Sequence, residues 1–176
     1  LSLVPGELLA AAPGLRVLDL RNNFLAVLPE QLGALAHLDT LLLDDNRLQE
    51  LPARALPGLR RLRTLSAANN RLRAVPAELG LLAQLHTLEL RSNRIEVLPD
   101  AALPPGAALR VLGLAHNQLA AVPLAVARLK HLRQLALHAN DVRHLPVELL
   151  QLGALEHLFV HGNPLSTVPK HVLRGA

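Results

Sequence analysis

Apolar residues recur along this chain in a pattern that repeats about every 23 residues. Each unit reads L-x-x-L-x-L-x-x-N-x-L, as in residues 15–25, and near-copies stand at residues 85–95 and 109–119. The L-x-L part has the period of a β-strand, whose successive side chains point to opposite faces. A short strand followed by a long return predicts coils that stack in parallel and share one continuous apolar core.

An asparagine stands at the same place after each predicted strand. These residues are Asn23, Asn46, Asn70, Asn93, Asn117, Asn140 and Asn163, in steps of 23 or 24 residues. Each side-chain amide carries two donors and an acceptor, and can therefore satisfy backbone groups in the bend where strand pairing stops. Because the asparagines recur as a ladder, we expect them to be structural rather than catalytic or glycosylated.

A Val-Pro or Leu-Pro pair marks the return half of each coil. Its prolines are Pro5, Pro29, Pro52, Pro76, Pro99, Pro123, Pro146 and Pro169. Proline fixes φ and suits the first turn of a short helix. Apolar residues three apart follow, as in residues 30–38. The spacing predicts short helical or 3-10 turns on the side opposite the strands.

These features together resemble the leucine-rich repeat family, with seven copies over essentially the whole chain. The resemblance implies an α/β repeat solenoid: a curved, right-handed horseshoe with a parallel β-sheet on its concave face and short helical or 3-10 turns on its convex face. The 23-residue copies are similar to the repeats of intracellular Ras-group proteins. The 24-residue copies, at residues 51–62 and 98–109, are more similar to the typical repeats common in extracellular proteins.

The two ends of the sequence also fit this frame. Leu1 lies four residues before Pro5, as Leu25 lies before Pro29, so the sequence opens in the middle of a coil. Residues 161–176 resemble the closing coil of intracellular members of the family. We therefore expect a single leucine-rich-repeat domain over residues 1–176, cut mid-coil at both ends, as a segment of a longer protein.

Composition limits the chemistry that the chain can perform. It has two Phe and no Cys, Met, Trp or Tyr, which excludes disulfides and cysteine-ligated zinc. The mild net charge of +4 and the lack of stacking aromatics argue against nucleic-acid binding. No apolar run reaches the length of about 18 residues that membrane insertion requires. Nucleophile, phosphate-loop and metalloprotease motifs are missing, so we expect no enzyme activity, no cofactor and no metal.

The residues that alternate with the buried leucines are expected to face the concave surface. The first row is Asp19, Leu42, Ser66, Glu89, Gly113, Ala136 and Phe159. The second row is Arg21, Asp44, Ala68, Arg91, Ala115, His138 and His161, and the third is Asn22, Asp45, Asn69, Ser92, His116, Ala139 and Gly162. Unlike the core rows these do not repeat, so we expect all three to vary freely and to set partner specificity.

Two groups of residues in these rows are candidate contacts for a partner. The charged group is Arg21, Asp44, Glu89 and Arg91, and the aromatic group is Phe159 with His116, His138, His157 and His161. Neighbouring strands lie about 5 Å apart, so His138 and His161 should be close. An exposed aromatic residue beside polar groups is typical of an interface anchor, and we place the binding site at Phe159.

Alternatives remain open for the same residues. Imidazoles this close are also compatible with a metal site or a pH switch. Phe159 could instead pack against a further C-terminal element of the parent protein. A cluster of arginines between residues 54 and 73 fits either a solvated mixed surface or contact with an acidic or phosphorylated partner.

The sequence therefore predicts a protein–protein interaction module that binds a protein partner on its concave face. We expect it to serve as the recognition arm of an intracellular signalling or scaffold protein, because cysteines and glycosylation sequons are missing. The alternative is a segment of an extracellular adhesion protein or receptor ectodomain. A third possibility is a spacer whose concave face binds nothing.

Overall fold

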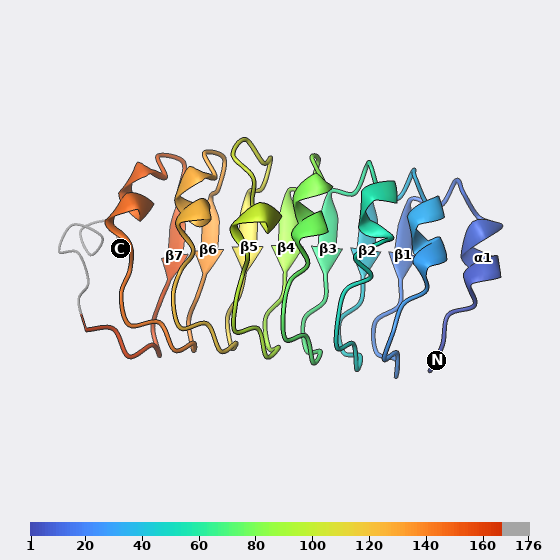
Figure 1. Cartoon of the computed structure of the whole chain (residues 1–176), viewed down its shortest axis with the longest axis horizontal. Coiled ribbons are helices and arrows are strands. Elements are labelled where there is room, and N and C mark those ends of the chain that lie inside the picture. The colour runs from blue at the N-terminus through green and yellow to red at the C-terminus, as the bar shows by residue number, and fades with distance from the viewer. Residues whose placement is uncertain (167–176) are drawn as a thin grey trace.

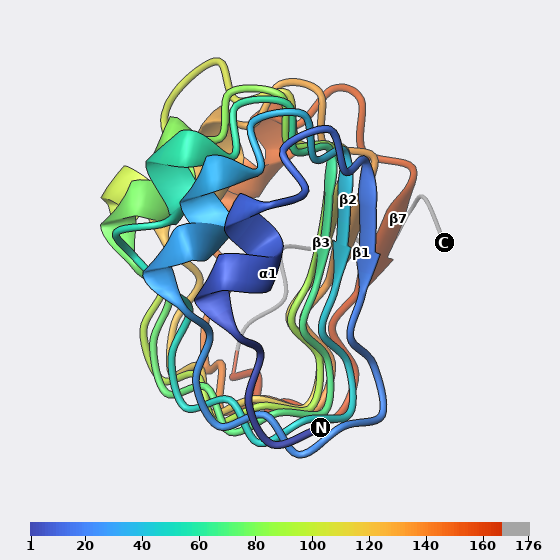
Figure 2. The ribbon, with the colours of Figure 1, turned by 90° about the vertical axis from the view of Figure 1, so that its right-hand side faces the viewer.

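The computed structural model describes residues 1–166 of the chain. Successive coils lie side by side from the N-terminus to the C-terminal end of the described part (Figure 1). Viewed along this stack, the strands form one side of every coil and the short helices form the other (Figure 2). No helix in residues 1–166 has both the length and the apolar character needed to cross a membrane. The Val168–Pro169 pair lies outside the described residues.

One parallel sheet of seven strands runs the length of the molecule, with the strands in chain order. The strands are β1 (Val17–Asp19), β2 (Thr40–Leu42), β3 (Thr64–Ser66), β4 (Thr87–Glu89), β5 (Val111–Gly113), β6 (Gln134–Ala136) and β7 (His157–Phe159). The register does not slip, so the central leucine of each strand pairs with that of the next, as Leu65 does with Leu88. These leucines face inward, and the predicted leucine-rich-repeat solenoid is confirmed.

The opposite side of the coils carries short helices, most of which begin directly after a proline of the predicted series. They are α1 (Gly6–Ala10) and the 3-10 helices η1 (Glu30–Ala34), η2 (Leu56–Gly58), η3 (Ala77–Leu81), η4 (Asp100–Ala102), η5 (Leu124–Arg128) and η6 (Val147–Gln151). The two repeat lengths differ here. The 24-residue copies hold η2 and η4, which have three residues, whereas the other 3-10 helices have five.

The core between sheet and helices is almost entirely aliphatic. Leu65, Leu88 and Leu112 on the strands and Leu59 on the helix side are fully buried. Burial of one such side chain contributes about 1.5–3 kcal/mol relative to exposure. Ala67, which replaces a leucine of the repeat, is fully buried as well. The rows of leucine in the sequence thus form one continuous cluster along the stack.

The asparagine ladder joins each coil to the coil before it. The Asn93 Oδ1 accepts the backbone N–H of Leu72 at 3.0 Å, and its Nδ2 donates to the carbonyls of Ala67 at 2.9 Å and Leu90 at 3.0 Å. The same pattern recurs at Asn46, Asn70, Asn117, Asn140 and Asn163. These backbone groups point along the stack at the bend, where strand pairing ends. The structural role predicted for the asparagines is confirmed.

The residue just before each ladder asparagine has a left-handed backbone. This holds for the whole third row, from Asn22 with φ 56° to Gly162 with φ 68°. Asn, Asp and Gly tolerate this conformation best, and they fill four of the seven positions. The expectation that this row varies freely is therefore wrong, because the bend restricts it. Ala139, with φ 55°, keeps a side chain that the conformation disfavours.

Replacing Asn93 with alanine should lower the free energy of unfolding by about 1–3 kcal/mol, because the N–H of Leu72 and two carbonyls lose their partner in a buried bend. Chemical denaturation would measure the change. The exposed neighbour Arg94 serves as a control, since Arg94→Ala should change stability by less than about 0.5 kcal/mol. Equal effects of the two substitutions would contradict the ladder.

Replacing Ala139 with glycine should stabilise the protein by up to about 1 kcal/mol, since the cost of the left-handed backbone disappears. Ala120→Gly, at an exposed position that lacks a positive φ, should instead destabilise by about 0.5–1 kcal/mol. Thermal unfolding of the two variants compares them directly. A loss of stability in both would mean that Ala139 is not strained.

Candidate partner-binding groove

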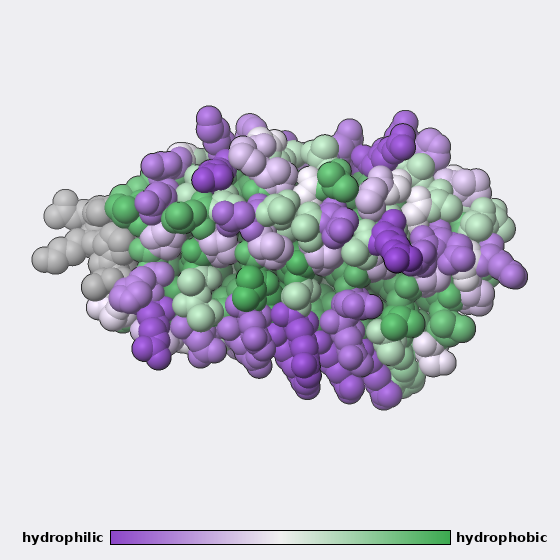
Figure 3. All heavy atoms as spheres, viewed as in Figure 1, coloured by the Kyte–Doolittle hydropathy of each residue, from purple (hydrophilic) through white to green (hydrophobic). Residues whose placement is uncertain are grey.

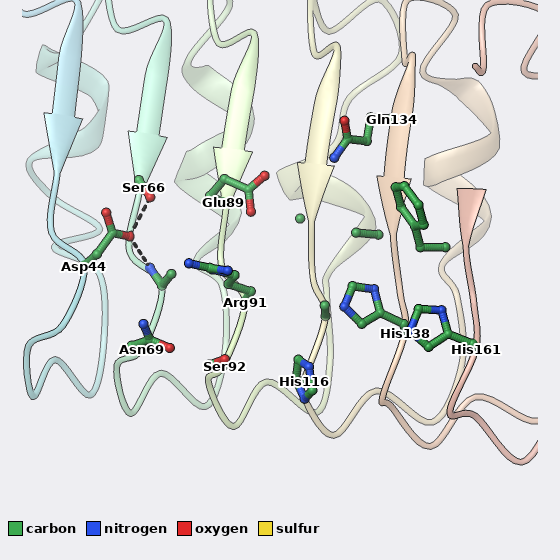
Figure 4. Close-up of a pocket in the computed structure, with 15 residues that line it drawn as sticks. Asp44, Ser66, Asn69, Glu89, Arg91, Ser92, His116, Gln134, His138 and His161 are labelled. Atoms are coloured by element: carbon green, nitrogen blue, oxygen red, sulfur yellow. Dashed lines mark hydrogen bonds between the residues drawn. The ribbon is translucent and has the colours of Figure 1, made fainter. Parts of the chain in front are cut away.

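A shallow groove of about 800 Å³ runs across the outer face of the sheet, from the coil of β2 to that of β7 (Figure 4). We call it the sheet-face groove. It is lined by Asp44, Ser66, Ala68, Asn69, Glu89, Arg91, Ser92, Gly113, Ala115, His116, Gln134, Ala136, His138, Phe159 and His161. The hollow lies over the small residues Gly113, Ala115 and Ala136, because larger side chains rise on both sides of them.

Seven of the nine residues predicted to contact a partner line this groove. They are Asp44, Glu89, Arg91, His116, His138, Phe159 and His161. Arg21 lies outside it and is paired with Asp19, and His157 also lies outside but stacks on Phe159 with ring centroids 6.2 Å apart. Sequence reasoning missed Gln134, which occupies the first position of β6. Side chains two residues apart on a strand point to the same face, so Gln134 points outward together with Ala136 of the first row.

Asp44 at one end of the groove is held by the neighbouring coil. Its Oδ1 accepts the hydroxyl of Ser66 at 2.5 Å and the backbone N–H of Ala68 at 2.7 Å, as the dashed lines in Figure 4 show. These two contacts fix the carboxylate in place on the sheet. Asp44 therefore contributes negative charge to this end of the groove from a fixed position.

Glu89 has a different environment, since its carboxylate lies over the backbone of Gly113 on the next strand. The side chain is half-buried, and within residues 1–166 it has no hydrogen bond or ion pair. Burial raises the pKa of this carboxyl, the charge of Arg91 acts against that rise, and the charge of Asp44 adds to it. Glu89 is thus a carboxylate that has lost part of its water without gaining a protein partner.

The equivalent pair in the first coil shows what Gly113 changes. Asp19 and Arg21 stand in the same two rows as Glu89 and Arg91, and they form an ion pair at 2.7 Å. The hydrogen bonds from Arg21 lower the pKa of Asp19 to about 2. Asp19 faces Leu42 on the neighbouring strand, whereas Glu89 faces a glycine. The missing side chain leaves room for Glu89 to turn away from Arg91 and into the groove.

An aromatic cluster forms the other wall. His138 lies at its centre, stacked on His161 with ring centroids 4.6 Å apart and edge-on to His116 at 5.4 Å and to Phe159 at 6.2 Å. The predicted closeness of His138 and His161 is confirmed. Phe159 is 40% exposed. The second phenylalanine, Phe24, lies outside the groove with the Arg47 guanidinium 4.7 Å from its ring centroid.

His138 carries an unusual buried nitrogen. Its Nδ1 is shielded from solvent and has no hydrogen-bond partner among the residues that the structure describes. Burial lowers the pKa of His138, and the neighbouring His161 and His116 lower it further, so the ring favours its neutral form. A search of residues 1–166 finds no group of three or more His, Cys, Asp or Glu side chains arranged to hold a metal ion.

The helix side of the molecule differs from the sheet face in its chemistry. Hydrophilic and hydrophobic residues are interspersed over this face (Figure 3). Its exposed apolar side chains include Leu81, Leu124, Val147 and Leu150 on the 3-10 helices. A small apolar cleft of about 150 Å³ lies beside η3 and η4 and includes Leu79. This side supplies control positions for experiments on the groove.

The raised pKa of Glu89 makes a testable prediction about stability and pH. The pKa of the Glu89 carboxyl is higher in the folded protein than in the unfolded chain, where it is near 4.5. The ionised carboxylate therefore destabilises the fold at pH values above its folded pKa. Glu89→Gln removes this charge and should therefore raise the free energy of unfolding at pH 7. At pH 3.5, where the carboxyl is largely protonated in both states, the same substitution should raise it less. Denaturation at both values measures this, with Glu148→Gln on η6 as control. A variant that loses stability at pH 7 would contradict it.

Comparison with known proteins agrees with this architecture. Residues 13–73 and 83–142 match the family model described as leucine rich repeat. A segment of 53 residues is 40% identical to Plant intracellular Ras-group-related LRR protein 7 of Oryza sativa subsp. japonica, which corresponds to 30% of this chain and 20% of the rice protein. The chain thus spans only part of the relatives that it matches.

Two solved structures extend the comparison to nearly the full length. A leucine-rich-repeat protein of Leptospira interrogans superposes with a TM-score of 0.92 at 31% identity, over 98% of this chain and 43% of that one. The second structure is the ectodomain of the Arabidopsis thaliana membrane receptor kinase GASSHO1/SCHENGEN3, solved in complex with CASPARIAN STRIP INTEGRITY FACTOR 2. It superposes with a TM-score of 0.83 at 29% identity, over 96% of this chain and 21% of that one. With the family model matching more than half of its residues, the chain belongs to the leucine-rich repeat family.

Proposed function

We propose that the sheet-face groove binds another protein and that the domain is the recognition arm of a larger intracellular signalling or scaffold protein. Leucine-rich-repeat domains generally serve as protein-binding modules and are typically non-catalytic. The proposal goes further by placing the contact surface on one face and by treating residues 1–176 as one domain of a longer chain.

One observation carries the proposal: core positions repeat from coil to coil, whereas the residues lining the groove do not. Packing explains the leucines and hydrogen bonding explains the asparagines, but neither accounts for Phe159, His138 or Glu89 on the outer face. An exposed aromatic ring beside partly buried polar groups has the composition of an interface hot spot. Small residues next to it leave space for a partner side chain.

An enzymatic function has little support from the groove. It is open and shallow, so it would exclude water poorly from a reacting group. Its two serines, Ser66 and Ser92, are not hydrogen-bonded to a histidine of the described chain; Ser66 donates to Asp44. The side chains fit the contact surface of a partner better than the assembly of a nucleophile and base.

For the compartment, the partial match to a rice protein named as intracellular supports a cytoplasmic location, as does the lack of cysteine. The likeness to a plant receptor ectodomain keeps an extracellular role as the second candidate. A tagged full-length protein in its native cell separates the two by protease protection. Digestion of the domain in intact cells would contradict the cytoplasmic proposal.

Selection of peptides from a random display library against the purified chain would test the binding surface, whatever the identity of the natural partner. We expect the selected peptides to depend on the groove, so that Phe159→Ala weakens their binding by about 2 kcal/mol or more. The stability of that variant should stay nearly unchanged, since the ring is 40% exposed. Isothermal titration and thermal unfolding provide the two measurements.

Leu124→Ala on the helix side is the matched control and should leave peptide binding unchanged. Binding that tolerates Phe159→Ala but is lost with Leu124→Ala would place the contact surface on the helix side and contradict the proposal. A large loss of stability in Phe159→Ala with binding retained would instead assign the ring to packing.

A further inference from the structure

The centre of the sheet-face groove is a recess between two unlike walls. Glu89, Gly113, Ala136 and Phe159 occupy successive positions of one register row across four strands. Three strand spacings separate the two outer residues by roughly 14 Å at the backbone. Glu89 leans over Gly113 from one side, and the Phe159 ring approaches His138 of the β6 coil from the other. Gly113 and Ala136 leave open space between these two side chains.

The chemistry of this recess is unbalanced. The Glu89 carboxylate is half-buried and has no hydrogen bond or ion pair within the described residues. The Nδ1 of His138 is buried and also lacks a partner among residues 1–166. The floor is formed by Gly113 and Ala136, which offer no polar side chain. A carboxylate that has lost water calls for an incoming donor, and the unused imidazole nitrogen adds a second polar atom without a partner beside it.

We propose that this recess receives a basic side chain, of which arginine fits best, from the protein partner. The inference rests on the proposed binding function and names the chemistry of one contact. A guanidinium can donate two hydrogen bonds to the Glu89 carboxylate while its plane lies against the Phe159 ring. An ammonium or guanidinium over an aromatic face gains further from the ring's negative charge.

Other occupants match the recess less well. An anionic side chain would be repelled by the Glu89 carboxylate that borders the recess. An apolar side chain would leave the carboxylate buried more deeply with no partner. The chain itself already uses the proposed pairing on another surface, where the Arg47 guanidinium lies 4.7 Å from the Phe24 ring centroid.

Arg91 is the nearest internal competitor for Glu89, and the first coil indicates why it does not close the recess. There the equivalent Arg21 binds Asp19 at 2.7 Å, opposite a leucine. Here the space above Gly113 lets Glu89 turn away, and no ion pair to Arg91 forms within 4.0 Å in the described structure. Gly113 thus keeps the carboxylate in the recess and available to a partner.

The test is an NMR titration of the labelled full chain with N-acetyl-arginine amide as the probe. We expect millimolar binding with shifts at Gly113, Ala136 and the His138 ring. N-acetyl-citrulline amide has the same shape without the charge and should bind at least about fivefold more weakly, as expected for loss of one charged contact.

Two variants connect the binding to Glu89 itself. Glu89→Gln removes the charge, and Gly113→Ala puts a methyl group where the carboxylate lies, so that the side chain must leave the recess. Each should weaken arginine amide by about fivefold or more. Gly113→Ala should still fold, since the atoms nearest to the new methyl group belong to the end of the flexible Glu89 side chain. Glu148→Gln on η6 is the control and should bind like the parent.

Equal shifts with the arginine and citrulline probes, or unchanged binding in both groove variants, would overturn the inference. The selected peptides separate this failure from that of the proposed function. Peptides that need Phe159, lack a basic residue and tolerate Glu89→Gln would remove the inference and leave the binding function. Peptides that ignore the groove, together with specific binding of the arginine probe, would contradict the proposed binding function and with it the partner contact, and would show only that the recess accepts a free basic group.

Discussion

Hydrogen bonds from one asparagine side chain per coil to the backbone of the coil before it determine how this protein is built. A three-residue strand pairs few backbone groups, so the bend that follows it would otherwise leave buried donors and acceptors without partners. The asparagine amide satisfies both kinds of group at once and fixes the spacing between coils. The leucine rows can then pack in straight lines, and the molecule grows by repetition.

This constraint divides the residues of every coil into those that the stack requires and those that it leaves open. Inward leucines, ladder asparagines and the left-handed residue before each asparagine belong to the first group. The outward strand positions belong to the second, where a glycine costs the fold little. Gly113 illustrates the consequence: its missing side chain redirects Glu89 and creates the recess, while the strand pairing around it stays regular.

The sequence was sufficient to predict the sheet, the core and the ladder because each depends on a residue type repeated at one spacing. It was less informative wherever a property depends on the neighbour across the strand. Arg21 pairs with Asp19 where Leu42 lies opposite, whereas Arg91 and Glu89 form no ion pair within the described residues where Gly113 lies opposite. The sequence did not predict the left-handed backbone at Ala139, because alanine is not a residue type that favours a positive φ.

The central claim is that the stack determines stability and the groove determines binding, and one variant tests both halves together. It replaces Glu89, His138, Phe159 and His161 with alanine in a single chain, and is measured by chemical denaturation and by binding of the selected peptides. The account predicts that the free energy of unfolding changes by no more than about 2 kcal/mol, since all four residues are partly or fully exposed, while peptide binding is lost. An unfolded variant, or a folded one that still binds the peptides, would contradict it.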